Sequence, residues 1–429
     1  MIRKTFLLLF STSLVIFGKV SPPLPAELAD YKLTPAPEAS VRLQKGDRLA
    51  ICGDSITEQK QYSVLMETYL TACLPELEIT CRQFGWSGEQ AGGFLSRIDN
   101  DVLRFKPTVA TTCYGMNDFQ YVPFDEAIAQ EYRENTVKIA QKFKAAGTRA
   151  VIGSSGIIDS VPDWVQGAKG DKKVLNLALS QFRNIALEAA ETEKVGFADV
   201  FQPMLIANLQ AKATFGEGFQ VSGKDGVHPG WAGHVIMAYA FLKGLGIDGE
   251  IGTITWDEGS GAATATDGHK VLSSESGKIS LESSRLPFAP GSGPLDSDNS
   301  IRAGMALIPF DTKLNRFILK IANHKSESYT VTWGETSKTY TAEQLHDGIN
   351  LASEFQENPL VEPFTKIQEA VAAKQDFETK QIKELVHGEA GKTDMEGTFA
   401  STEKEREPLV KALADSIQPA RHELTIQAK

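Results

Sequence analysis

The sequence predicts an α/β domain built on a parallel sheet, followed by a β-rich and helical extension. Between Gly46 and Gly246, short apolar runs alternate with longer amphipathic segments, which is the pattern of parallel strands with helices on both faces. Beyond Gly246, short runs of β-formers follow one another closely, and from about Leu360 the pattern becomes helical. The length of 429 residues fits roughly two or three domains.

Short apolar runs bounded by turn residues define the strands of the first region. They are Leu49–Cys52, Ile79–Phe84, Val109–Cys113, Ala150–Ser154 and Val195–Ala198. The clearest helix between them spans Asp125–Lys144, where apolar residues recur at helical spacing among Glu, Lys and Arg. The same pattern predicts helices over Val174–Ala190 and Trp231–Leu242.

The extension is predicted to begin with strands and to end with helices. The strand candidates are Ile251–Trp256, Lys270–Ser273, Lys278–Leu281, Arg316–Ala322 and Tyr329–Trp333. Phe364, Ile367 and Val371 share one helical face, and Ile382, Leu385 and Val386 continue it. A last helix is expected from Glu403 to Gln418, before Pro419.

The N-terminus has the layout of a signal peptide. Arg3 and Lys4 precede the apolar stretch Thr5–Phe17, whose 13 residues are fewer than the about 20 that span a bilayer. An uncleaved anchor is the alternative, and Gly18, Ser21, Ala26 and Ala29 compete as cleavage sites. We therefore expect a secreted or periplasmic protein without stable membrane insertion after cleavage. The predicted division is a signal peptide and leader (1–29), an α/β domain (30–249), a β-rich region (250–350) and a helical region (351–429).

Composition limits the class of partner. Hydrophobic residues make up 41% and charged residues 23%, which is typical of a globular chain. The net charge of −11 argues against a nucleic-acid partner, because such binders need a basic face. The sequence leaves the oligomeric state open.

The four cysteines have no metal-ligand spacing, and no metal or other cofactor is expected. Cys73 and Cys81 flank a short helix-to-strand connection and are the one pair that a disulfide could join, which the sequence leaves undecided. Cys52 and Cys113 each end a strand-like run, so they are expected to be buried thiols on neighbouring strands.

Four polar blocks lie at or just beyond the carboxyl ends of predicted strands, where open α/β sheets place their ligand sites. The blocks are Gly53-Asp54-Ser55, Gly85-Trp86-Ser87-Gly88-Glu89, Gly115-Met116-Asn117-Asp118 and Asp225-Gly226-Val227-His228-Pro229. Each block alone is a weak signal. Their order and their placement at strand ends together indicate a common site.

The residue types in these blocks suit ester hydrolysis. Ser55 is the candidate nucleophile, His228 the base that would take its proton, and Asp225 the carboxylate that would orient the imidazole. The backbone N–H groups of Ser55 and Gly88 and the side-chain amide of Asn117 are the candidate oxyanion donors.

Each residue also has a purely structural interpretation. Ser55 and Glu58 match a helix capping box, in which the hydroxyl only satisfies a backbone N–H. Gly85 and Gly88 are equally consistent with turn glycines, Asn117 with a turn residue and His228 with a surface loop. Asp118 is expected to support a turn. It is the coincidence of four blocks at four strand ends that favours chemistry.

These blocks resemble those of the SGNH subgroup of GDSL esterases and lipases, over about residues 46–245. Ser55 matches the family's nucleophile, Gly88 and Asn117 its oxyanion residues, and Asp225 with His228 its Asp-x-x-His pair. The resemblance implies a three-layer α/β/α sandwich of flavodoxin-like type and metal-free hydrolysis of an ester or thioester. Two departures are Ile56 in place of Leu and Phe84 in place of Asn, and the second makes Gly85 an alternative donor to Gly88.

The leading hypothesis is a secreted serine esterase acting on a small-molecule or glycan ester, with acetyl on a carbohydrate as the suggested acyl group. A lipase or thioesterase with the same mechanism, or a non-catalytic glycan-binding or envelope module, is the alternative. The sequence places aromatic and apolar side chains near the blocks, namely Trp86, Met116, Phe119, Tyr121 and Trp164. The extension is expected to brace the α/β domain or to form a dimer interface.

Overall fold

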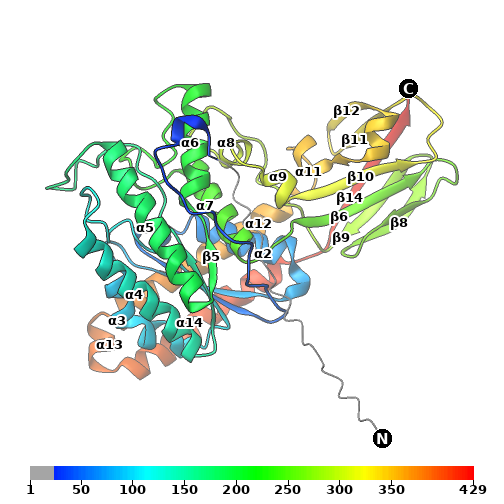
Figure 1. The fold of residues 1–429 in the computed structure, drawn as a ribbon. Coiled ribbons are helices and arrows are strands. Elements are labelled where there is room, and N and C mark those ends of the chain that lie inside the picture. The colour runs from blue at the N-terminus through cyan, green and yellow to red at the C-terminus, as the bar shows by residue number, and fades with distance from the viewer. Residues whose placement is uncertain (1–23) are drawn as a thin grey trace, which may run out of the picture.

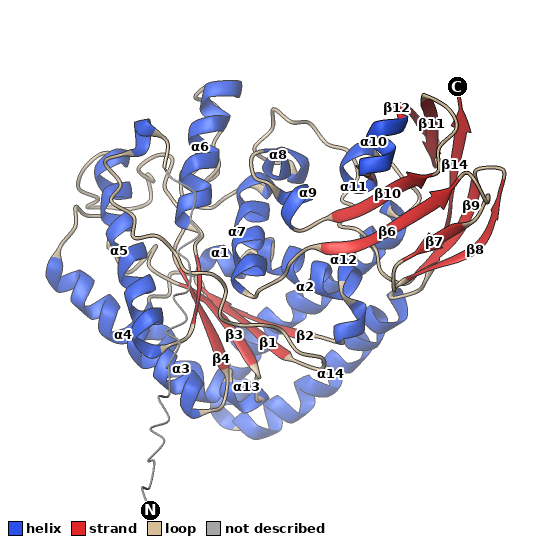
Figure 2. Cartoon of the chain, turned by 45° about the vertical axis from the view of Figure 1, so that its right-hand side comes forward, coloured by secondary structure: helices blue, strands red, loops and turns tan. Residues whose placement is uncertain are grey.

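The structure is a computed structural model and describes residues 24–429, so the predicted signal peptide lies almost wholly outside the described residues. A five-stranded parallel sheet forms the first region (Figures 1 and 2). Its strands are β1 (Arg48–Gly53), β2 (Thr80–Gly85), β3 (Val109–Cys113), β4 (Arg149–Gly153) and β5 (Gly196–Ala198). All five predicted strands are present, with bounds that differ by one residue at most ends.

The strand order is β2-β1-β3-β4-β5, the flavodoxin-like order of doubly wound sheets. Every residue of β3 is buried, because a central parallel strand is covered by helices on both faces. In Figure 2 the sheet lies between α3, α4 and α5 on one side and α2 and α7 on the other. The predicted three-layer α/β/α sandwich is confirmed.

The three predicted helices of this region are present as α4, α5 and α7, and the sequence-based prediction did not name the others. They are η1 (Ala26–Leu28), α1 (Ser55–Glu58), α2 (Tyr62–Cys73), η2 (Pro75–Leu77), α3 (Ala91–Asp101), η3 (Leu103–Phe105), α4 (Glu126–Ala145), α5 (Lys172–Glu193), α6 (Phe201–Phe215) and α7 (Trp231–Gly244). Asp125 and Asp171 cap α4 and α5 by accepting backbone N–H groups, which fixes where these helices begin.

The extension contains two further sheets, with orders β13-β10-β6-β7 and β12-β11-β14-β9-β8. Their strands are β6 (Glu250–Asp257), β7 (Ala263–Ala265), β8 (His269–Glu275), β9 (Lys278–Ser283), β10 (Arg316–Ala322), β11 (Ser328–Trp333), β12 (Thr336–Thr341), β13 (Ile349–Asn350) and β14 (Ala420–Ala428). Phe317, on strand β10 of the four-stranded sheet, lies against His269 and Trp333 of the five-stranded sheet of the extension. The ring centroids are 4.8 and 5.8 Å apart. The two sheets therefore share an aromatic core.

Strand β14 is absent from the sequence-based prediction, which ends with a helix. It pairs antiparallel with both β9 and β11, so the last strand of the chain lies at the centre of its sheet, as Figure 1 shows in red. Polar residues alternate along it, and its burial depends on partners more than 80 residues away in the sequence. The predicted division into four ranges stays a prediction.

The helices of the extension are α8 (Ile301–Ala306), α9 (Phe310–Lys313), α10 (Ala342–Asp347), α11 (Leu351–Glu354), α12 (Val361–Lys380), the π-helix η4 (Gln381–Val386), α13 (Glu389–Thr393) and α14 (Met395–Ser416). The last helix begins at Met395 rather than at the predicted Glu403. Its N-cap is Asp394, which accepts the N–H of Gly397, a local signal that the polar sequence around it obscures.

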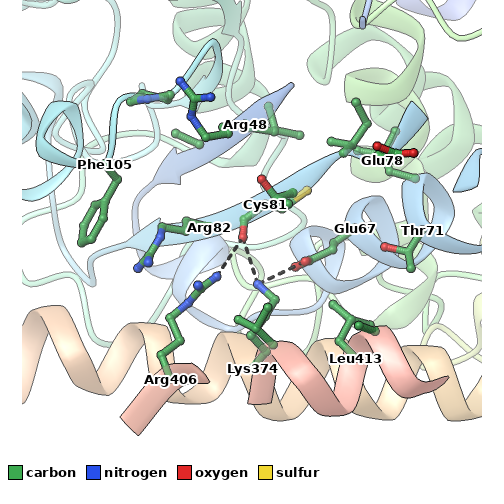
Figure 3. A pocket seen from close by; sticks show the side chains of 18 of the residues that line it. Arg48, Glu67, Thr71, Glu78, Cys81, Arg82, Phe105, Lys374, Arg406 and Leu413 are labelled. Atoms are coloured by element: carbon green, nitrogen blue, oxygen red, sulfur yellow. Dashed lines mark hydrogen bonds and ion pairs between the residues drawn. The ribbon is translucent and has the colours of Figure 1, made fainter. Parts of the chain in front are cut away.

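Helices α12 and α14 cover the β2 side of the first sheet, where α12 contacts both α2 and β2. A buried set of charged residues joins them, and we call Glu67, Lys374, Glu378 and Arg406 the α12 ion cluster. Figure 3 shows three of them, Glu67, Lys374 and Arg406. Lys374 Nζ donates to the Cys81 carbonyl at 2.9 Å and to Glu378 at 2.8 Å, and it lies 3.1 Å from Glu67. The extension is thus fixed to the α/β region by ionic contacts across about 300 residues of sequence.

All four cysteines are buried free thiols, so the pair Cys73 and Cys81 is not bridged. Cys52 and Cys113 lie on the neighbouring strands β1 and β3, as predicted. Within residues 24–429, no helix is both long enough and apolar enough to cross a membrane. The same residues contain no grouping of three or more His, Cys, Asp or Glu side chains that is suited to hold a metal ion.

Candidate active site

The four predicted blocks meet at the carboxyl-end edge of the first sheet. Ser55 follows β1, Gly88 follows β2 and Asn117 follows β3, while Asp225 and His228 lie in the loop before α7. Because the strands are parallel, their carboxyl ends bring these segments to one edge. We call this group the site edge.

A line of hydrogen bonds joins Ser55, His228 and Asp225. Ser55 Oγ lies 2.8 Å from His228 Nε2, and His228 Nδ1 lies 2.6 Å from Asp225 Oδ2. An aspartate at Nδ1 favours the tautomer that carries its proton there, which leaves Nε2 free to accept the proton of the serine hydroxyl.

Asp225 is held by its own loop. Its Oδ1 accepts the backbone N–H groups of Val227 at 2.9 Å and His228 at 2.8 Å. Burial by itself raises the pKa of Asp225, but these bonds and the one from the His228 imidazole lower it below its usual value. Asp225 therefore stays ionised beside the imidazole.

The capping-box interpretation of Ser55 is wrong. The N-cap of α1 is Asp54, whose Oδ1 accepts the N–H of Ile56 at 3.0 Å. Ser55 is the first residue inside α1, so its backbone N–H has no carbonyl partner within the helix. Glu58, the other half of the expected box, binds Ser87 and Lys383 instead.

Gly88 lies in a tight turn from Trp86 to Glu89, which we call the oxyanion turn. The N–H of Glu89 donates to the Trp86 carbonyl at 3.2 Å, and Gly88 has a φ of +74°, a conformation that glycine adopts without strain. A Cβ on Gly88 would meet no atom within 4 Å. The turn therefore leaves open space beside Gly88.

Gly85, the alternative donor, has a different task. It is the last residue of β2, and a Cβ there would lie 2.3 Å from the Glu58 nitrogen. Gly85 thus permits the close approach of α1 to the sheet, and it needs no positive φ. Its role is packing.

Asn117 contacts the oxyanion turn directly. Its Nδ2 donates to the Glu89 carbonyl at 3.1 Å, which uses one of its two hydrogens and leaves the other available. Asp118 accepts the N–H groups of Ala91 and Gly115 at 2.8 and 2.9 Å. Asp118 therefore supports the turn around Asn117, as predicted from the sequence.

One aromatic residue predicted near the blocks, Trp164, contacts the Asp225 and His228 pair, and a second, Tyr121, packs against Trp164. Trp164 is 50% exposed, its ring lies 5.8 Å from that of His228, and its Nε1 lies 3.4 Å from Asp225 Oδ2. Tyr121 packs edge-on against Trp164 at 5.6 Å. An exposed indole beside the imidazole forms an apolar wall for a ligand.

The sequence-based prediction did not identify the residues that hold the loop before α7, which carries Asp225 and His228. Asp159, which follows β4, accepts the N–H of Ser222 at 2.8 Å and donates its own N–H to the Gly226 carbonyl at 2.9 Å. These bonds connect segments more than 60 residues apart, and no local motif announces them.

A cavity of about 520 Å³ lies elsewhere, between β2 and the second half of α14 (Figure 3). It is lined mainly by apolar groups together with members of the α12 ion cluster, and none of the residues of the four blocks lines it. The basic groups at its floor are already paired, because Lys374 binds three oxygens and Arg406 binds Glu378.

Comparisons with known proteins find similar sequences for the α/β region. Residues 51–236 match the GDSL-like lipase/acylhydrolase family. An acetylxylan esterase from Geobacillus stearothermophilus is 26% identical over 232 residues, which cover 48% of this chain and 98% of that protein.

One solved structure is similar in fold over the extension as well as the α/β region. A gut microbial diltiazem-metabolizing enzyme superposes with a TM-score of 0.71 at 21% identity and covers 91% of this chain and 100% of its own. A crystal structure of an acetylxylan esterase from Geobacillus stearothermophilus covers 48% of this chain and 97% of its own, with a TM-score of 0.40 and 22% identity. The α/β region of this chain belongs to the GDSL-like lipase/acylhydrolase family, and the protein is an ester-hydrolysing enzyme.

Proposed function

We propose that the protein is an exported serine esterase that removes acetyl groups from a carbohydrate, with Ser55, His228 and Asp225 as its catalytic triad. The observation that carries the mechanism is the line of hydrogen bonds of 2.8 and 2.6 Å through these three residues. The carbohydrate substrate is supported by the 26% identical acetylxylan esterase and by the exposed Trp164. Export is supported by the basic and then apolar pattern of residues 3–17.

The proposed reaction follows from the positions of the protons. Ser55 Oγ attacks the ester carbonyl while its proton passes to His228 Nε2, and Asp225 stabilises the resulting imidazolium. The negative oxygen of the tetrahedral intermediate is bound by the N–H groups of Ser55 and Gly88 and by Asn117 Nδ2. Collapse breaks the bond to the sugar oxygen, which takes the proton from His228 and leaves as the alcohol.

The acyl-enzyme is then hydrolysed by the same groups. A water molecule gives a proton to His228 and attacks the acyl carbon, and the second tetrahedral intermediate collapses to release the acid and return the proton to Ser55. Each half-reaction forms one C–O bond and breaks another, so the enzyme ends in its starting state.

The test is a substrate panel for the parent and for Ser55→Ala. Esterase, lipase and thioesterase activities are distinguished with four substrates: acetylated xylooligosaccharides, nitrophenyl acetate, nitrophenyl dodecanoate and an acetyl thioester. We expect acetate release from the first two, and a loss of at least about 10³-fold in Ser55→Ala. Ser96→Ala is the matched control, because Ser96 is exposed and its hydroxyl binds only the Gly93 carbonyl one turn earlier.

Equal activity of Ser55→Ala and the parent would overturn the serine mechanism. A preference for the dodecanoate ester would overturn the acetyl assignment, and hydrolysis of the thioester alone would overturn the ester assignment.

A further inference from the structure

The π-helix η4 of the extension lies beside the oxyanion turn, although more than 290 residues separate the two in the sequence. Lys383 of η4 binds both carboxylate oxygens of Glu58, at 2.6 and 2.7 Å. Glu58 in turn accepts the backbone N–H of Ser87, the residue before Gly88, at 2.5 Å. A π-helical turn within a long helix is often found at a functional site.

Glu58 connects the two halves of the proposed site. It ends the one-turn helix that Ser55 begins, and its carboxylate holds the oxyanion turn. Burial by itself raises the pKa of Glu58, but the bonds from Lys383 and Ser87 lower it below its usual value. Glu58 therefore stays ionised, and an ionised carboxylate accepts stronger hydrogen bonds than a neutral one.

A second chain of contacts reaches the other end of the same turn. His387, directly after η4, lies 2.9 Å from Asp101, and Asp101 pairs with Arg97 at 3.4 Å. Arg97 binds both oxygens of Glu89, at 2.6 and 2.7 Å. Glu89 ends the oxyanion turn, and its carbonyl accepts from Asn117.

The ring of Trp86, at the start of the turn, is enclosed by the same groups. His387 meets it edge-on at 5.0 Å, Lys383 Nζ lies 5.4 Å from its centre and the Arg97 guanidinium lies 5.1 Å from its centre. A cation over an indole face is attracted by the negative face of the ring. The first, second and last residues of the turn are thus all held by groups that include the extension.

We propose that Lys383 and His387 are positioning residues for catalysis, which hold Ser87 and Glu89 so that the N–H of Gly88 and the amide of Asn117 point at the substrate oxyanion. This inference rests on the proposed function. It gives the extension a part in the reaction beyond bracing, because oxyanion donors act only when they are fixed before charge develops.

The test compares kcat and KM for nitrophenyl acetate in Lys383→Met, which keeps the aliphatic stem and removes the charge. Losing one oxyanion donor costs about 10²–10³ in turnover, so a misplaced donor is expected to lower kcat about 10-fold with KM nearly unchanged. Lys383→Arg should restore kcat to within about 3-fold of the parent, since a guanidinium also binds a carboxylate on two oxygens. Lys366→Met is the control, because its partner Glu362 lies on the same α12 surface and both side chains are exposed.

A double variant identifies the route. If Lys383 acts through Glu58, Lys383→Met combined with Glu58→Gln lowers kcat no further than the more damaging of the two single changes, whereas additive losses would overturn the route. If Lys383→Met does not fold, the kcat of Glu58→Gln alone tests the proposal, since this variant leaves the extension unchanged. A reduced kcat supports the proposal and a parental kcat overturns it.

The two proposals fail in different ways. Parental activity in Ser55→Ala contradicts the serine mechanism itself. An inactive Ser55→Ala together with a parental kcat in Lys383→Met contradicts only the positioning role of the extension.

Discussion

The site edge and the α12 ion cluster both contain titratable side chains, but these side chains lie in different surroundings. At the site edge, the side chains of His228 and Asp225 are 24% and 35% exposed. In the cluster, Lys374, Glu67 and Glu378 are each 2% exposed. The partly exposed pair is accessible from solvent, whereas the charges of the buried cluster are satisfied by one another.

The same comparison shows that a shifted pKa alone does not identify a residue as part of the proposed triad. Burial raises the pKa of Asp54 to about 7 and lowers that of His234 to about 3, yet the hydroxyl of Ser55 is bonded to neither. His234 binds the N–H of Tyr62 and the side chain of Gln59. Geometry at the site edge therefore identifies the reacting groups better than titration does.

The largest expected effect separates stability from activity. Lys374→Met leaves Glu67 buried without its cation, and breaking a buried pair in this way costs about 3–5 kcal/mol of unfolding free energy. We expect the folded fraction to keep the parental kcat, because none of the cluster contacts Ser55 or His228. Urea unfolding followed by tryptophan fluorescence measures the first quantity, with Lys366→Met as an exposed control. An unchanged stability would contradict the importance given to the cluster.

The second prediction concerns Asp54, which carries a buried carboxyl within the site edge. Its folded pKa of about 7 lies above the unfolded value, so its contribution to stability is full below about pH 4 and declines by about 1.4 kcal/mol per pH unit up to about pH 7. Asp54→Asn keeps the cap on Ile56 and removes this decline, since asparagine is an equally good N-cap.

The measurement is the difference in unfolding free energy between Asp54→Asn and the parent at pH 5, 6, 7 and 8. We expect the variant to gain relative stability with rising pH up to about 7 and then to level off. His234, whose pKa is lowered by burial, changes the stability with pH in the opposite direction to Asp54. Because His234 is present in both proteins, its contribution cancels in the difference. A difference that does not change with pH would show that Asp54 is not held protonated.

The smallest expected effect is at Trp164. Trp164→Ala removes the exposed ring beside His228, so we expect KM for acetylated xylooligosaccharides to rise about 10-fold, equivalent to about 1.4 kcal/mol. Nitrophenyl acetate, which offers no sugar ring, should be affected less. Trp164→Phe keeps an aromatic face but loses the N–H near Asp225, and it should recover most of the affinity. Equal losses on both substrates would contradict a role in binding the sugar.

The sequence predicts the first region well because its signals are local. Apolar runs such as Val109–Cys113 coincide with strands, and parallel topology then brings Ser55, Gly88, Asn117 and His228 to one edge. The extension was harder to predict. The strand β14 becomes central only through pairing with β9 and β11, and Lys383 reaches Glu58 across 325 residues. Such contacts leave no periodicity or motif near either partner.

The most direct test of the proposed triad is covalent labelling of Ser55. A fluorophosphonate reacts with a serine only when a neighbouring base has activated it, so peptide mass spectrometry of the labelled full-length enzyme should find a single adduct on Ser55. The label should be lost in Ser55→Ala and strongly reduced in His228→Gln, while Ser96→Ala labels as the parent does. An enzyme that hydrolyses nitrophenyl acetate but carries no adduct on Ser55, or carries one on another serine, would contradict the proposed mechanism.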